Sequence, residues 1–140
     1  HFRVGGATEV NSGTGTYVAY IFAHDDQSFG ENGDESIIHC DTYSGSSGSV
    51  TETCGFRPAF LLVKETSSSG YPWVIVDTAR NGGGTSMGNT LSPNTTGTES
   101  NYGDIVTTSS TGFTIPAPGP STPSALNDSG KTYAYVAISS

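Results

Sequence analysis

The stretch AFLLVKETSSSGYPWVIVDTA (Ala59–Ala79) indicates the fold class. Ala59–Thr66 and Trp73–Ala79 are rich in β-branched, aromatic and other apolar residues, a composition typical of strands. The segment between them, SSSGYP (Ser67–Pro72), contains the Gly and Pro that favour a turn. The stretch therefore predicts a β-hairpin. Because both runs contain nearly continuous apolar residues, we expect central strands covered on both faces, or inner strands of a two-sheet sandwich.

Strand-like runs of this kind recur along the chain, separated by turn-rich segments at the roughly 8–12-residue spacing of sandwiches and barrels. No window combines helical periodicity over three turns with freedom from Gly and Pro. We therefore predict an all-β domain, an antiparallel β-sandwich of jelly-roll type with little or no helix. Arg80–Asn89 and Pro116–Ser124 are predicted to be loops. The other predicted strands are Thr16–His24, Ser36–Tyr43, Ser49–Cys54, Asp104–Ser110, Gly112–Pro116 and Thr132–Ser139.

Nearly the same phrase occurs close to both ends of the chain. NSGTGTYVAYIFA begins at Asn11 and NDSGKTYAYVAIS begins at Asn127, an offset of 116 residues. Self-similarity at a fixed offset is typical of tandem modules. We expect residues 1–23 to be the terminal hairpin of a preceding repeat, and residues 24–140 to be one β-sandwich module. A hairpin duplicated inside one sandwich is the alternative.

Charge and composition exclude two classes of partner. Thirteen acidic residues against five Lys and Arg give a net charge of −8. Nucleic acid and anionic lipid are bound by basic patches, so neither is an expected partner. The sequence contains no apolar stretch long enough to cross a bilayer, and membrane insertion is not expected. The start at His1, without Met or a signal peptide, suggests a piece of a longer polypeptide.

The densest polar segment is HDDQSFGENGDES, which begins at His24. Calcium takes six to eight oxygen ligands, and acidic Gly-rich loops can supply them. The candidate calcium ligands are Asp25, Asp26, Asp34 and Glu35. Their spacing differs from that of an EF-hand, so a solvated acidic loop is the main alternative, and a carboxylate pair of a glycosidase is a weaker one.

Cysteine, histidine and aromatic residues are the other candidates for a site. Cys40 and Cys54 are interpreted as small buried residues, as a cross-strand disulfide, or as a metal or redox pair; without a second Cys pair they do not form a zinc pattern. His39 alternates with its neighbours in a strand and is expected to face solvent or an interface. Tyr71 and Tyr102 offer stacking surfaces in or beside polar loops. Trp73 is predicted to be in the core.

Three phrases together resemble a module of marine bacteriophage proteins: TYVAYIFAHDDQSFGENGDESIIHCDTYSG, GFRPAFLLVKETSSSGYPWVIVDTAR and GFTI…NDSGKTYAYVAI. The resemblance covers Thr16 to Ile138. The family is a domain of unknown function in phage fibres and other virion proteins, often beside lectin-like sandwich domains. It implies no catalytic residue, and its members carry an apolar residue in place of Cys54, which argues against a disulfide. The matching positions are Gly55, Phe56, Pro58, Leu61–Lys64, Trp73–Asp77, Arg80, Asn94, Gly130, Thr132 and Tyr133.

From the residues and the resemblance we expect a non-enzymatic phage virion protein, assembled in the bacterial cytoplasm. It would be a module of a tail fibre or similar appendage whose loops bind a host-surface glycan or envelope protein. Expected partners are other virion proteins and further copies, as a homo-oligomer and commonly a trimer; no cofactor is expected except calcium. The alternatives are a capsid decoration or head-fibre protein and, less favoured, a polysaccharide depolymerase. The predicted binding residues are Asp25, Asp26, Asp34, Tyr71, Arg80 and Tyr102.

Overall fold

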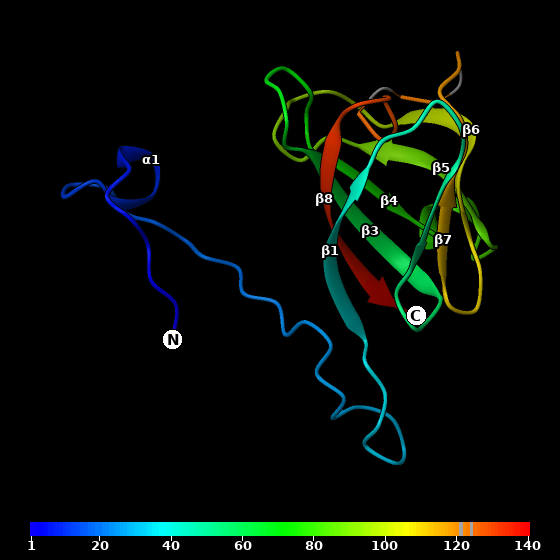
Figure 1. The fold of residues 1–140 in the computed structure, drawn as a ribbon, viewed down its shortest axis with the longest axis horizontal. Helices are drawn as coiled ribbons and strands as arrows, with labels where there is room; N and C mark the ends of the chain where they lie inside the picture. Colours follow the sequence, from blue (N-terminus) through cyan, green and yellow to red (C-terminus); the bar gives the residue numbers. More distant parts are fainter. Residues whose placement is uncertain (121, 124) are drawn as a thin grey trace.

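The computed structural model describes residues 1–120, 122–123 and 125–140, and its strands form one strongly curved sheet that is nearly a barrel (Figure 1). The order in the sheet is β1-β8-β3-β4-β5-β6-β7-β2, and neighbouring strands are antiparallel. The prediction of an antiparallel all-β domain with almost no helix is therefore confirmed. The strands are β1 (Ile38–Ser44), β2 (Val50–Thr53), β3 (Pro58–Glu65), β4 (Val74–Asp77), β5 (Ser86–Leu91), β6 (Ser100–Thr108), β7 (Gly112–Ile115) and β8 (Thr132–Ser139).

The predicted hairpin is present as β3 and β4, which pair with Leu61 opposite Val76. Both of these side chains are fully buried inside the curved sheet. The next residues along each strand point outward and are only half-buried. The strands are thus completely covered on their inner face alone. The inner face of β8 adds Tyr133, Tyr135 and Ala137 to the core.

The sequence prediction of a loop over Arg80–Asn89 is wrong for its second half, because β5 begins at Ser86. Gly88 lies where the β5–β6 register shifts, and a Cβ atom there would overlap the backbone carbonyl of Gly103. The strand therefore needs glycine at this position, although glycine is depleted in strands. The first half of the segment contains the short 3-10 helix η1 (Ala79–Asn81).

Residues 1–37, all of them described, precede the sheet and contain the single-turn helix α1 (Thr8–Asn11) and one isolated bridge, Phe29–Glu35. Residues 1–23 lead away from the sheet (Figure 1). The expected strand at Thr16–His24 is wrong for this chain, since no neighbouring strand offers backbone partners there. That residues 1–23 end a preceding repeat, and that residues 24–140 form one module, stay predictions.

The predicted Pro-rich loop contains an isolated bridge, Gly119–Thr122, in its described part; Ser121 and Ser124 lie outside the described residues. In the part of the chain that the structure describes, no helix has the length and apolarity needed to cross a membrane.

Glu65 ends β3 with a completely buried side chain. Its carboxylate accepts hydrogen bonds from the hydroxyl and backbone N–H groups of Ser67 and Ser68, at the start of the hairpin loop. These donors, the Ser67 hydroxyl first, outweigh the effect of burial and lower the pKa of Glu65 from 4.5 to about 2. The buried charge is therefore held by hydrogen bonds and fixes the geometry of the loop.

Glu65→Gln is expected to reduce the decrease in unfolding free energy that the chain shows as the pH is lowered. Because the folded-state pKa lies below the unfolded value, the carboxylate stabilises the fold above pH 4.5, and this contribution is lost as pH falls toward about 2. Urea midpoints measured between pH 7 and pH 2.5 test this. The Glu65→Gln variant should have a lower midpoint at pH 7 and a smaller decrease on acidification. Glu9→Gln, on exposed α1, is the control and should behave like the wild type. Equal slopes for all three chains would contradict the assignment.

Candidate functional site

A pocket of about 600 Å³ lies where β1 begins and where β2 and β8 end. Its wall combines the acidic segment that precedes β1 with residues that follow β2 and with the turn between β6 and β7. Polar side chains predominate, and one aromatic ring, Phe56, contributes to the wall. The lining residues are Asp25, Gln27, Asp34, Glu35, Ser36, His39, Thr53, Cys54, Gly55, Phe56, Arg57, Ser110 and Ser139.

The acidic part of the wall is shaped by a small closed loop. Phe29 and Glu35 exchange two backbone hydrogen bonds, of 3.1 and 3.0 Å. Gly30 and Gly33 turn the chain between them with positive φ angles of 81° and 66°, a conformation that suits glycine. This loop brings Asp34 and Glu35 to the pocket together with Asp25.

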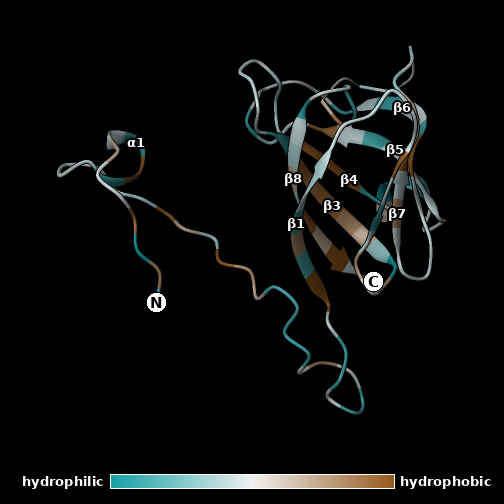
Figure 2. Cartoon of the chain, viewed as in Figure 1, coloured by the Kyte–Doolittle hydropathy of each residue, from teal (hydrophilic) through white to brown (hydrophobic). Residues whose placement is uncertain are grey.

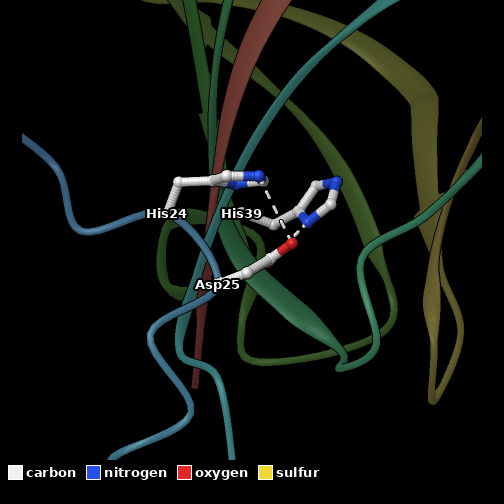
Figure 3. A group of neighbouring side chains, drawn as sticks. All are labelled: His24, Asp25 and His39. Carbon is white, nitrogen blue, oxygen red and sulfur yellow. Dashed lines mark hydrogen bonds and ion pairs between the residues drawn. The ribbon is translucent and has the colours of Figure 1, made fainter.

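His24, Asp25 and His39 form a cluster at the rim of the pocket (Figure 3). His39 Nδ1 lies 2.8 Å from Asp25 Oδ1, and His24 Nε2 lies 3.4 Å from Asp25 Oδ2. The backbone fixes the cluster in place: Asp25 N donates to Ile38 O at 2.9 Å, and Cys40 N donates to His24 Nδ1 at 3.0 Å. The acidic segment is therefore attached to the outer edge of β1.

The donor set of this cluster suits a metal ion of borderline softness. One ligand atom from each residue lies within 4.8 Å of the other two, and two imidazoles with a carboxylate are typical ligands of Zn²⁺. Since His24 Nδ1 accepts from Cys40 N, its proton is on Nε2, facing Asp25. A metal would have to displace that proton. Calcium prefers oxygen ligands; of its predicted ligands, Asp25, Asp34 and Glu35 line the pocket and Asp26 does not. Calcium binding stays a prediction.

The Cys54 thiol in the wall of the pocket is protonated at neutral pH. Burial, together with the negative charges of Glu52 and Asp25, raises the pKa of the Cys54 thiol to about 11. Cys40 and Cys54 are both free thiols, so the disulfide interpretation does not hold in this structure. Close by, the hydroxyl of Tyr135 is also buried, and its interaction with the Cys54 thiol opposes part of this rise in pKa. Burial and the neighbouring Asp41 raise the pKa of Glu52, against the effect of His39.

A family model described as a domain of unknown function, DUF7483, matches residues 1–140. The chain belongs to the DUF7483 family. No curated protein and no solved structure matches the chain. The DUF7483 match includes the curved sheet, the pocket and the N-terminal segment, so all three are parts of one family pattern.

The remaining predicted binding residues of this DUF7483 chain lie away from the pocket. The Tyr71 hydroxyl donates to Asp128 at 3.3 Å, and its ring packs against the core. Tyr102 is 40 % exposed in β6. Trp73, predicted to be buried, is also 40 % exposed, because it lies just before β4 begins. Its backbone N–H donates to Asn94.

Arg80 connects β4 with the residue that precedes β6. Its guanidinium binds Asp77 at 2.6 Å, Glu99 at 2.8 Å and the carbonyl oxygen of Ile75 at 3.2 Å. Because three groups of the chain itself accept hydrogen bonds from its guanidinium, Arg80 stabilises the fold and lies outside the pocket.

Sequence reasoning did not identify His39, Phe56 and Arg57 as site residues. His39, expected to face solvent or an interface, has a side chain only 14 % exposed, at the pocket. The sequence did contain a signal for the burial of His39. His39, Asp41 and Tyr43 are every second residue of β1 and share one face, on which Tyr43 is buried. No comparable signal exists for Arg57, which reaches the pocket through the curvature of the sheet.

Proposed function

We propose that the chain is a module of a phage virion appendage, such as a tail fibre, and that its pocket binds a glycan of the host surface. The composition of the pocket wall carries this proposal. Asp34, Glu35 and Gln27 accept or donate hydrogen bonds, Arg57 donates, and Phe56 offers an apolar ring. Placed polar groups that orient a ligand, together with an aromatic ring, are features of small-ligand sites of this size.

A sugar presents hydroxyl groups that donate to carboxylates and accept from guanidinium groups, and its C–H face packs on an aromatic ring. The net charge of −8 disfavours anionic polysaccharides. The favoured ligand is therefore a neutral sugar or an amino sugar. Weak binding at each copy becomes strong attachment when many copies act together.

The assembly proposed is a homo-oligomer, most simply a trimer, that contacts other virion proteins. Apolar side chains on the outer face of β3, β4 and β8 are only half-buried and would be covered by further copies; they are Phe60, Leu62, Ile75, Val136 and Ile138. We propose that the curved sheet packs as a two-layer sandwich of jelly-roll type, with no enzymatic activity. The free cysteines fit assembly in a reducing bacterial cytoplasm.

Glu35→Gln and Arg57→Ala are each expected to weaken glycan binding about 10- to 100-fold, the effect of one charge-assisted hydrogen bond. A glycan array would identify the ligand, and calorimetry would measure its Kd. Glu31→Gln is the matched control, because Glu31 lies in the same acidic segment but does not line the pocket. Absence of any glycan ligand, or an equal loss with Glu31→Gln, would contradict the proposal.

A separate experiment tests whether the chain lies in an appendage or on the capsid of the virion. Gold-labelled antibodies against the chain should decorate the appendages of intact particles. Labelling of the capsid surface would instead favour the decoration protein.

A further inference from the structure

The N-terminal segment folds like the segment that leads into β8. Residues 7–23 correspond to the described part of residues 123–139, at an offset of 116 residues. The two segments share a similar phrase, NSGTGTY at Asn11–Tyr17 and NDSGKTY at Asn127–Tyr133. Three hydrogen bonds shape the second copy. They run from Leu126 N to Pro123 O (2.9 Å), from Lys131 N to Asp128 O (3.2 Å) and from Asp128 N to the Tyr133 hydroxyl (2.8 Å).

The first copy contains the same three hydrogen bonds at the same offset. They run from Val10 N to Ala7 O (3.1 Å), from Gly15 N to Ser12 O (3.1 Å) and from Ser12 N to the Tyr17 hydroxyl (2.7 Å). No hydrogen bond among the described residues links residues 1–23 to the sheet. The turn therefore forms from local sequence, without the sheet that surrounds the second copy.

After the turn, the two copies have opposite environments. β8 lies between β1 and β3, and Tyr133 and Ala137 are completely buried. The first copy is apolar and unpaired after the turn (Figure 2), and the counterparts of Tyr133 and Ala137 are Tyr17, 46 % exposed, and Ile21, 73 % exposed. Val18 and Tyr20, which correspond to half-buried residues of β8, are 79 % and 84 % exposed. Such a run of exposed apolar side chains indicates a protein contact.

Two positions in the sheet of the same chain are closed to residues 16–23. The position between β1 and β3 is occupied by β8. The outer edge of β1 is capped, because Cys40 N donates to His24 Nδ1 and Thr42 N donates to Asp41 Oδ1 at 2.7 Å. Capped edge groups prevent the addition of another strand.

We infer that residues 16–23 form the last strand of a second module of this family, in the position that β8 holds here, between that module's counterparts of β1 and β3. Matching β8, Tyr17, Ala19 and Ile21 point into the core of the partner. Asn11 then takes the buried position of Asn127. The inference concerns assembly and is independent of glycan binding.

The test is a tandem polypeptide in which residues 24–122 are joined directly to residues 7–140. The first copy then has residues 7–23 in place of its own residues 123–139. In hydrogen exchange, amides 16–23 should exchange rapidly in the 1–140 chain and at least 100-fold more slowly in the tandem. Tyr20→Pro should abolish this protection and unfold the first copy, while leaving the 1–140 chain unchanged, because proline cannot occupy a central strand.

A second tandem, residues 24–139 followed by residues 24–140, checks that the first copy folds with its own strand. If this control folds while amides 16–23 of the test tandem exchange as rapidly as in the 1–140 chain, the inference is overturned. Protection of amides 16–23 in the 1–140 chain itself would also overturn it, since the segment would then pack on its own module.

Discussion

Phe113→Ala is expected to destabilise the fold by about 3–5 kcal/mol, the usual cost of removing a buried aromatic side chain. Phe113 lies in β7 and is 1 % exposed. Its ring meets Tyr135 edge to face, with 5.1 Å between ring centroids and an angle of 84°. This contact joins the β7 side of the curved sheet to the β8 side. The substitution therefore leaves a cavity and removes an aromatic pair.

Urea unfolding followed by fluorescence measures this loss. The midpoint should fall with little change in the slope of the transition, since the surface exposed on unfolding is nearly the same. Phe113→Leu should cost less, because it leaves a smaller cavity. Phe2→Ala is the control: Phe2 is 59 % exposed, and its loss should leave the midpoint unchanged. Equal effects of Phe113→Ala and Phe2→Ala would show that the core lies elsewhere.

Asn127→Ala is expected to cost about 2–4 kcal/mol, because three backbone groups lose a buried partner at once. Asn127 is completely buried. Its Oδ1 accepts from Ser46 N at 2.8 Å, and its Nδ2 donates to the carbonyl oxygens of Gly48 (3.0 Å) and Pro116 (2.9 Å). One amide thus connects the β1–β2 loop with the segment that follows β7.

Asn11→Ala is the matched control, because Asn11 begins the other copy of the same phrase and is exposed. In the 1–140 chain this change should shift stability by no more than about 0.5 kcal/mol. In the tandem polypeptide it should destabilise the first copy, as Asn127→Ala destabilises the second. Chemical denaturation of the four variants measures both effects. A large cost of Asn11→Ala in the 1–140 chain would contradict the equivalence of the two positions.

The parts of the fold that sequence predicted are those that local composition determines. The apolar runs of β3 and β4 with their Gly-Pro turn predicted the hairpin, and β8 has the predicted bounds. β5 was missed because Gly88 is required by a backbone contact with Gly103, which lies in another strand. The strand at Thr16–His24 was predicted from composition alone, whereas a strand also needs a partner. Composition does not supply that information.

The residues of the pocket also fall into those that the sequence predicted and those that it did not. Asp25 and Asp34 were predicted together because they lie in one short acidic segment, which the structure closes into a loop. His39 and Arg57 join them from β1 and from the residues that follow β2. Their proximity depends on how the sheet curves and in which order its strands pair, and no local pattern encodes either.

The central position of β8 determines when this domain can fold during translation. β1 and β3 become neighbours only through β8, which follows all the other strands in the chain. While the ribosome synthesises residues 38–131, the facing edges of β1 and β3 have no partner. Folding of this sheet must therefore wait until residue 139 has left the exit tunnel. Until then, apolar segments of the nascent chain remain accessible to chaperones.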